Sequence, residues 1–330
     1  MRIALRMPNW LGDAVMASVV ISQIIEKWPK AQIYIWAKPS ICSLFKDDPR
    51  IFSFIELKRT AFSKFNPFRQ DIKELRSLRL DLIIILTNSF SSIVESNFIR
   101  SKKSLGYVVG LHSWFLSNPI KPKAHLHHMF RYQGLLSELF PNISKNFAPK
   151  LYVGLEDELW AEHVIQGKKF ITFHPSAAYG ETKCWPLDRY EQLIDKLVQK
   201  GLHVFIVGDD QAYKKTAHWQ TMFNHQQVIN LAGQTTLGQL MAICKKSSIV
   251  VSGDSGPLHV AAALAPSAIG IFGSTDPSKT APVHNCQIVY EPTVCSPCFK
   301  RHCTIGLTCL KNISVEKIYS LIFKHLNENA

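Results

Sequence analysis

The sequence contains no apolar run long enough to form a membrane-spanning helix, which needs about 20 consecutive, mostly apolar residues. Its N-terminus also lacks the basic region, apolar core and small-residue cleavage site of a secretory signal peptide. Hydrophobic residues make up 46% and charged residues 19% of the chain, as in ordinary globular proteins. We therefore expect a cytoplasmic protein, and 330 residues are enough for two domains.

Several nucleotide-binding and nucleic-acid-binding signatures are also missing. No G-x-G-x-x-G follows the first strand-like run, and the chain has no Walker or kinase-type glycine loop. These absences argue against a dinucleotide at the first strand and against the common phosphate-transfer enzymes. The chain also has no RNP motif and no zinc-finger spacing.

Acidic residues are scarce compared with basic ones. The chain has 25 Asp and Glu against 38 Lys and Arg, which gives a formal net charge of +13. Such an excess favours an anionic partner. Because the basic residues are scattered and form no dense run, phosphorylated small molecules or an anionic membrane surface fit the charge better than nucleic acid.

Continuous apolar runs alternate with amphipathic ones through both halves of the chain. This alternation predicts an α/β fold with parallel sheets covered on both faces. Two such blocks predict two doubly wound, Rossmann-like domains, 1–155 and 156–330, and a last helix over 314–327. The expected strands are 3–7, 32–37, 52–57, 81–86, 103–109, 170–176, 203–208, 228–230, 248–253 and 267–273. The expected helices are 14–28, 40–46, 68–79, 187–200, 211–223, 236–246 and 257–264.

The loop PNWLGD follows the first strand and precedes a helix. Ligands of doubly wound sheets bind beyond the carboxyl ends of the strands, so this loop is a candidate site. Gly12 allows a substrate to approach the backbone closely. Asp13 lies at the expected helix start, where it either caps the helix or acts as a general base facing a cleft between the domains.

The loop HPSAAYGETKCWP follows a strand of the second half. It places Lys183 just before a helix start, where a cation is unfavourable unless an anion lies between the two. A phosphate would resolve that conflict, and an exposed loop lysine is the alternative. In VGDDQ, Asp209 and Asp210 follow another strand and either bind a ribose or cap a helix.

The segment SGDSGPLHVAAAL combines a tight turn with a slim helix. The N–H groups at the start of such a helix form an anion site, helped by the helix dipole. The alternative is that Asp254 or Ser255 caps the helix. His259 lies one turn further, and a lone histidine is more often structural than functional.

Four segments, taken in their order along the chain, resemble the ADP-heptose:lipopolysaccharide heptosyltransferases, glycosyltransferase family nine. They are PNWLGDAVM, PSAAYGETKCWP, LAGQTTLGQL and VVSGDSGPLHVAAALAPSAIGIFGSTDP. The P-x-W-x-G-D and G-x-x-K-x-W-P patterns are most similar to the members that add the second heptose. The resemblance implies the GT-B fold, two Rossmann-like domains facing a cleft. It also implies an acceptor-binding N-terminal domain, a nucleotide-sugar-binding C-terminal domain and a last helix that returns to the N-terminal domain.

The resemblance also implies roles for single residues. Asp13 matches the family's catalytic base, and the neighbouring acceptor-side residues are Asn9, Trp10 and Gly12. The residues matching the donor and phosphate site are Ser176, Lys183, Asp254, Ser255, Gly256 and His259. The nucleotide positions are Asp209, Asp210, Thr235 and Leu237. Gly253 and Cys184 depart from the family's common polar and basic residues, which leaves the donor sugar open.

The implied reaction moves L-glycero-D-manno-heptose from ADP-heptose to Kdo–lipid A that carries an inner-core sugar, with inversion at the anomeric carbon. A single displacement needs one general base. The ADP-sugar is a substrate, no cofactor is required, and no D-x-D motif suggests a metal. The basic surface implies peripheral contact with the inner face of the anionic inner membrane. The alternatives are a family-nine transferase with another donor or acceptor, and a non-catalytic nucleotide-sugar or anion-binding protein.

Four of the eight cysteines lie close together in CSPCFKRHCTIGLTC. A C-x-x-C pair with two further cysteines is compatible with zinc or an iron–sulfur cluster, but this spacing matches no standard site. We therefore expect no metal, and reduced or partly disulfide-linked thiols in a surface loop. The candidate ligands, should a metal bind, are Cys295, Cys298, Cys303 and Cys309.

Overall fold

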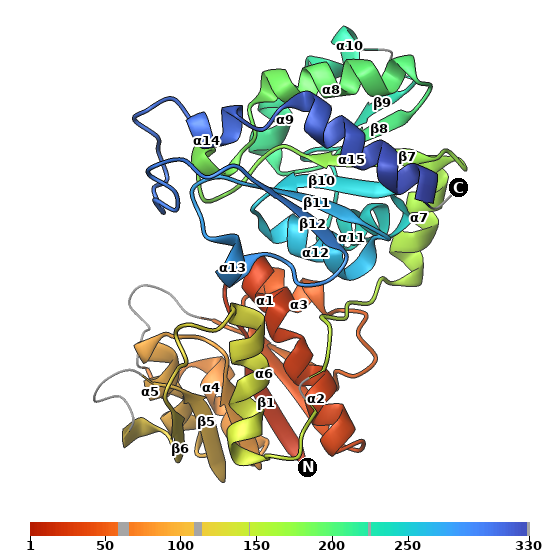
Figure 1. The fold of residues 1–330 in the computed structure, drawn as a ribbon. Coiled ribbons are helices and arrows are strands. Elements are labelled where there is room, and N and C mark those ends of the chain that lie inside the picture. The colour runs from red at the N-terminus through yellow and green to blue at the C-terminus, as the bar shows by residue number, and fades with distance from the viewer. Residues whose placement is uncertain (59–65, 109–113, 145, 224–225, 329–330) are drawn as a thin grey trace. The chain divides into compact units, whose positions relative to one another are not determined.

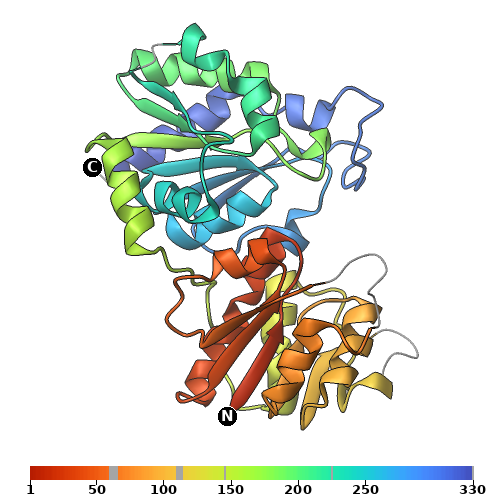
Figure 2. The same cartoon turned by 180° about the vertical axis from the view of Figure 1, so that it is seen from behind.

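The computed structural model describes residues 1–58, 66–108, 114–144, 146–223 and 226–328. The chain divides into two compact units, Met1–Tyr152 and Val153–Ala330. Each unit is built around one six-stranded parallel sheet (Figures 1 and 2). The observed division lies three residues before the one predicted from the sequence.

The sheet of the N-terminal unit has the strand order β3-β2-β1-β4-β5-β6. Its central strand β1 pairs with β2 and β4, with Ile3 opposite Ile33 and Leu82. These side chains are fully buried, as expected for strands covered on both faces. Residue 109, at the end of a predicted strand, lies outside the described residues. The strands are β1 (Arg2–Arg6), β2 (Gln32–Ala37), β3 (Ser53–Glu56), β4 (Leu82–Ile85), β5 (Lys103–Tyr107) and β6 (Asn118–Ile120).

The helices of this unit form two groups. Helices α1 and α2 pack against α6, and α4 packs against α5. The predicted helix 14–28 is two helices that meet at Ser18, whose N–H contacts two carbonyls of α1. Sequence patterns did not predict α5 and α6. The helices are α1 (Leu11–Ala17), α2 (Val19–Lys27), α3 (Pro39–Leu44), α4 (Gln70–Ser77), α5 (Phe90–Ile99) and α6 (His128–Leu139).

The sheet of the C-terminal unit has the order β12-β11-β10-β7-β8-β9, the same relative order as in the first unit. Every pairing in it is parallel. Its two central strands, β7 and β10, are buried along their whole length. The strands are β7 (Phe170–His174), β8 (His203–Ile206), β9 (Val228–Asn230), β10 (Ile249–Gly253), β11 (Ala268–Phe272) and β12 (Cys286–Tyr290).

Helices cover both faces of this second sheet. Side chains of α8 and α15 share one core cluster, and those of α7, α11 and α12 share another. The predicted helix 211–223 is divided into α9 and α10. The helices are α7 (Leu155–Ile165), α8 (Leu187–Gln199), α9 (Asp210–Thr216), α10 (Trp219–Met222), α11 (Leu237–Lys246), α12 (Gly256–Leu264), α13 (Pro277–Thr280), α14 (Thr308–Lys311) and α15 (Val315–Glu328).

The last helix is α15, and its predicted return to the N-terminal domain stays a prediction. It belongs to the C-terminal unit and packs on α8. Val315, Ile318 and Ile322 of α15 are buried in the core cluster that α8 also lines. Its apolar stripe is therefore satisfied within its own unit.

In both units the strand order reverses beside the first strand of the sheet, at β1/β4 and at β7/β10. Doubly wound sheets bind ligands in the crevice at such a switch point, outside the carboxyl ends of the strands. The loops after these four strands are therefore where sites are expected. None of the helices in the described part of the chain combines the length and the apolar character needed to cross a bilayer.

Candidate active site

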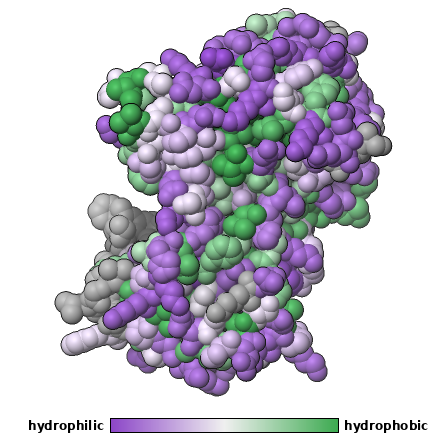
Figure 3. Space-filling model, in the orientation of Figure 1, coloured by the Kyte–Doolittle hydropathy of each residue, from purple (hydrophilic) through white to green (hydrophobic). Residues whose placement is uncertain are grey.

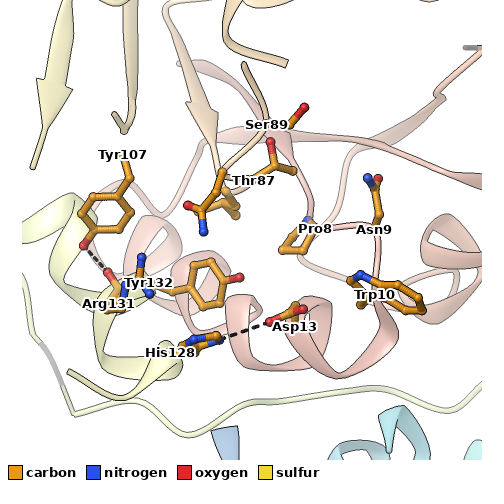
Figure 4. Close-up of a pocket in the computed structure, with 12 residues that line it drawn as sticks. Pro8, Asn9, Trp10, Asp13, Thr87, Ser89, Tyr107, His128, Arg131 and Tyr132 are labelled. Atoms are coloured by element: carbon orange, nitrogen blue, oxygen red, sulfur yellow. Dashed lines mark hydrogen bonds and ion pairs between the residues drawn. The ribbon is translucent and has the colours of Figure 1, made fainter. Parts of the chain in front are cut away.

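A pocket of about 300 Å³ opens at the switch point of the N-terminal unit (Figure 4). Its wall is formed by the loop after β1 with the start of α1, by residues 86–89 after β4, by Tyr107 of β5 and by the start of α6. Its volume is at the lower end of the range for small-molecule sites, roughly 300–1,000 Å³. The lining residues are Pro8, Asn9, Trp10, Asp13, Leu86, Thr87, Asn88, Ser89, Tyr107, His128, Arg131 and Tyr132.

Asp13 is the third residue of α1 and lines this pocket. The N-cap position belongs to Trp10, which makes no capping hydrogen bond with its side chain. The Asp13 carboxylate lies 3.5 Å from Nδ1 of His128, and the two side chains are 29% and 36% exposed. Asp13 is therefore not the helix cap, and it presents a solvent-accessible carboxylate to whatever enters the pocket.

Arg6 of β1 stabilises the loop between β1 and Asp13 through hydrogen bonds. This arginine is fully buried in β1, although a charged side chain is rarely buried without partners. Its guanidinium donates to Oδ1 of Asn9 at 3.0 Å and to the carbonyl of Met7, and it lies 5.4 Å from the ring centroid of Trp36. Arg6 therefore fixes the turn in which Asn9 and Trp10 reach the pocket.

Helix α6 supplies three lining residues that sequence reasoning missed. His128, Arg131 and Tyr132 are spaced by three and four positions, so they share one face of the helix. The Tyr107 hydroxyl donates to the backbone carbonyl of Arg131 and ties β5 to this helix. Burial and the Asp13 charge raise the pKa of Tyr132, which stays a neutral phenol. The segment HHMFRY mixes polar and apolar residues and gave no signal of a site, because only the packing of α6 brings these three side chains to the pocket.

The switch point of the C-terminal unit joins two of the predicted donor loops. Nζ of Lys183 lies 2.6 Å from Oδ2 of Asp254, and the side chains are 17% and 5% exposed. Oγ1 of Thr275 donates to the same carboxylate oxygen at 2.6 Å. Lys183 also lies 4.7 Å from the ring centroid of Tyr179. Asp254 therefore orients Lys183 and serves as its counter-ion. Lys183 is not the exposed loop lysine that the sequence left as the alternative.

Gly253 explains how the two loops come so close. A Cβ at this position would lie 2.0 Å from the backbone carbonyl oxygen of Lys183. Only glycine leaves room for that contact, since real Cβ atoms essentially never approach so closely. The departure from a polar residue noted in the sequence therefore has a steric reason.

Helix α12 begins at Gly256 with Ser255 as its N-cap. The Ser255 side chain makes no capping hydrogen bond. Its Oγ lies 2.9 Å from Oγ of Ser252 and 3.4 Å from Nδ1 of His174. Burial lowers the pKa of His174 to about 4, so the imidazole is neutral at neutral pH. The polar network behind the loop therefore adds no positive charge.

The predicted nucleotide positions lie on neighbouring strand ends. Asp209 caps α9 by accepting from the N–H of Ala212 at 2.9 Å, so the capping alternative holds for it. Asp210 lies against Gly233, two residues before Thr235. Leu237 opens α11, which Thr236 caps.

Two further donor candidates lie near this region. A Cβ on Gly208 would lie 3.4 Å from Oγ of Ser176, which places that hydroxyl beside the loop after β8. His259 is buried within α12.

The cysteine-rich segment packs against the Lys183 loop. Tyr179 donates to the carbonyl of Phe299, Thr182 donates to that of Lys300, and Glu181 accepts from the N–H of Cys303. Backbone N–H groups lower the pKa of the Cys303 thiol. No group of three or more His, Cys, Asp or Glu is placed to hold a metal within the described ranges. The four cysteines Cys295, Cys298, Cys303 and Cys309 are free thiols.

Residues 69–308 match the model of glycosyltransferase family 9 (heptosyltransferase). One similar protein is the lipooligosaccharide heptosyltransferase 2 of Haemophilus ducreyi, 29% identical over 88% of each chain. Another is the lipooligosaccharide heptosyltransferase 2 of Campylobacter jejuni, 24% identical over 98% of this chain and 99% of that one.

A solved structure has the same fold over its whole length. The ADP-heptose lipopolysaccharide heptosyltransferase II of Escherichia coli superposes with a TM-score of 0.83, with 23% identity and full coverage of both chains. This likeness confirms the predicted GT-B fold with its two parallel sheets.

Proposed function

The chain belongs to glycosyltransferase family 9 and is a glycosyltransferase, and on that premise we propose that it transfers L-glycero-D-manno-heptose from ADP-heptose to the inner core of lipopolysaccharide. The acceptor is Kdo–lipid A that already carries an inner-core sugar, and the product gains the second heptose. The names of the similar proteins support this choice, since they are heptosyltransferases numbered 2 or II.

The observation that carries the proposal is the Asp13 pocket. A single accessible carboxylate lies among hydroxyl, amide and aromatic side chains at a switch point, the position where such folds bind ligands. We assign Asp13 as the general base. It takes the proton of the acceptor hydroxyl while that oxygen attacks the anomeric carbon, and the bond to ADP breaks with inversion. Asn9, Trp10 and Gly12 shape the acceptor side.

The donor site is assigned to the second switch point. Leaving ADP carries negative charge, which Lys183 and the N–H groups at the start of α12 stabilise. We place the phosphates among Ser176, Lys183, Asp254, Ser255, Gly256 and His259, and the adenosine near Asp209, Asp210, Thr235 and Leu237. The ADP-sugar is a substrate, and this chemistry requires no further cofactor.

Contact with an anionic membrane is supported by the uneven charge of the two units. Residues 1–152 carry 22 Lys and Arg against 10 Asp and Glu, a formal charge of +12, which leaves only +1 for the rest of the chain. Hydrophilic residues cover most of the face shown in Figure 3. We propose that the N-terminal unit, which holds the acceptor pocket, is held electrostatically at the inner face of the inner membrane, where each basic residue near the surface adds about 1 kcal/mol.

The test is incubation with ADP-heptose and Kdo–lipid A bearing one heptose or none, followed by mass spectrometry. We expect a mass gain of one heptose on the acceptor that already carries one. Gain only on the heptose-free acceptor would assign the first transfer instead. Binding of ADP-heptose without any product, under conditions where a known family member is active, would overturn the proposed activity.

A further inference from the structure

Among the charged side chains that line the Asp13 pocket, Arg131 has no ion-pair partner in the described part of the chain. Asp13 is paired with His128. The half-buried Arg131 guanidinium lies 5.8 Å from the ring centroid of Tyr107, and no carboxylate pairs with it among the residues described. Because the charge of an arginine cannot be removed at physiological pH, a positive group faces the pocket without a counter-ion from the described part of the chain.

Tyr107 contacts both the backbone and the side chain of Arg131. Tyr107 donates a hydrogen bond to the Arg131 backbone, and its ring lies beside the Arg131 head group. His128 is one helical turn before Arg131 on the same face of α6. Arg131 and Asp13 line the same pocket (Figure 4), so an anion bound by Arg131 would share that pocket with a hydroxyl presented to Asp13.

A second observation points to a ligand in the same place. Thr87 follows β4, is only 8% exposed and lines the pocket. Its Oγ1 is buried and has no hydrogen-bond partner in the described structure. Buried hydroxyls nearly always have a partner, so this oxygen needs one that the described residues do not supply. Asn88 and Ser89 continue the same polar wall.

We propose that Arg131 and Thr87 form a subsite for an anionic sugar unit of the acceptor. Arg131 binds its carboxylate or phosphate group, and Thr87 binds one of its hydroxyls. A guanidinium recognises either anion through paired hydrogen bonds. The inference rests on the proposed function, because it names the acceptor class of the same pocket. It makes the enzyme select an acceptor with a negative charge next to the reacting hydroxyl.

Direct binding tests the subsite without any transfer. The probes are mannose, mannuronic acid and mannose 6-phosphate, followed by ligand-observed NMR on the full chain. We expect the wild type to bind one or both anionic probes at least about tenfold more tightly than mannose, as a charge-assisted contact implies. The tighter anion identifies whether a carboxylate or a phosphate is preferred. Equal binding of all three probes would overturn the proposal.

Arginine variants separate the subsite from the overall charge. Arg131→Gln should abolish the preference for the anion, and Arg131→Lys should keep part of it. Arg79→Gln is the matched control, since it removes one exposed charge from the same unit. It should leave the preference unchanged. An Arg131→Gln protein that still prefers the anionic probe would show the subsite to be wrong.

Thr87→Val separates binding from folding. It removes an unsatisfied buried hydroxyl, so the melting temperature should stay or rise. Affinity for the probes should fall roughly threefold to tenfold, the effect of one neutral hydrogen bond. A fall in melting temperature with unchanged probe affinity would make Thr87 structural and contradict its role.

Transfer assays distinguish failure of the subsite from failure of the proposed function. In an active enzyme, Arg131→Gln should raise the acceptor KM roughly tenfold or more while the donor KM is unchanged. An unchanged acceptor KM would refute the subsite while the function stands. A wild type that binds the anionic probes but forms no heptosyl product would refute the function while the subsite stands.

Discussion

Nζ of Lys183 lies 2.6 Å from Oδ2 of Asp254, and this ion pair joins the loops after β7 and β10. The lysine assigned to phosphate therefore shares its charge with a carboxylate that is 5% exposed. One of its three N–H donors is used, which leaves donors for a ligand. The carboxylate sets the direction of the lysine and moderates its attraction for anions.

Replacing Lys183 should weaken phosphate binding more than nucleoside binding. Lys183→Met should lower the affinity for ADP roughly tenfold to a hundredfold, the value of a lost charge-assisted hydrogen bond. Affinity for adenosine should hardly change, and calorimetry measures both. The single variant leaves Asp254 buried and unpaired, so its melting temperature should fall. Adding Asp254→Asn should restore the melting temperature without restoring ADP binding. Equal losses for adenosine and ADP in the double variant would contradict the phosphate role.

Replacing Asp13 should separate chemistry from donor binding. Asp13→Asn keeps the shape of the side chain and removes the base, so the rate of transfer should fall by about a hundredfold to ten-thousandfold. The affinity for ADP should stay within a factor of about two of wild type, because Asp13 belongs to the other unit. Asp47→Asn, an exposed position of the same unit, is the control. Loss of ADP affinity in parallel with activity would show that Asp13 acts structurally.

Gly253→Ala should displace the loop after β7 that carries Lys183. The new Cβ would lie 2.0 Å from the carbonyl oxygen of Lys183, and relieving such a clash typically costs about 1–3 kcal/mol. Both the melting temperature and the affinity for ADP should fall. Gly134→Ala in α6, where the nearest atom would be 3.5 Å away, should leave the melting temperature unchanged or raise it. An unaffected Gly253→Ala protein would mean that the loops do not approach as described.

The buried His174 makes stability depend on pH. Burial lowers its pKa from 6.5 to about 4, so the unfolded chain takes up a proton before the folded one does. The stabilisation is fully present above pH 6.5 and is lost as the pH falls toward 4. Between pH 7.5 and 5.0 wild type should lose about 2 kcal/mol more than His174→Asn, measured by urea unfolding. Identical pH dependence of the two proteins would show that His174 titrates normally.

Activity should survive an excess of EDTA. The leaving-group charge is assigned to Lys183 and to backbone N–H groups, while Asp209 caps a helix and Asp254 pairs with the lysine. Asp209 and Asp254 therefore do not form the pair of carboxylates that a Mg²⁺ site would use. Loss of activity at an unchanged melting temperature, reversed by Mg²⁺, would overturn this mechanism. Loss of both, reversed by Zn²⁺, would instead make the cysteine-rich segment a structural metal site.

The fold was predictable because its strands are continuous apolar runs. The expected strands coincide with β1 to β5 and β7 to β11, to within a few residues at their ends. Helices α5 and α6 were missed because their hydrophobic pattern is weak: Glu95 and Gln133, for example, are polar yet buried. Such burial depends on partners far away in the sequence, as with Arg69, which pairs with Glu95 at 2.8 Å.

Several residues of the candidate site could be chosen because they directly follow a predicted strand. The local sequence pattern on helices was less informative. Lys183 and Asp254 were selected from separate loops, yet only the folded sheet shows that they touch. Residues 87–89 follow the predicted strand 81–86 and could have been included by the same rule. Arg131 could not, since a residue on a helix joins a pocket only through tertiary packing.

The division of the candidate groups between two units has a kinetic consequence. Asp13 belongs to Met1–Tyr152, while Lys183 and Asp254 belong to Val153–Ala330. In the proposed mechanism each half-site fills by itself, but transfer needs both. The covalent connection between the units replaces a second-order encounter by a first-order one, with an effective local concentration on the order of millimolar for a short flexible tether. Dilution of the enzyme therefore leaves the rate per molecule unchanged, whereas cutting the chain at the connection would make that rate depend on protein concentration.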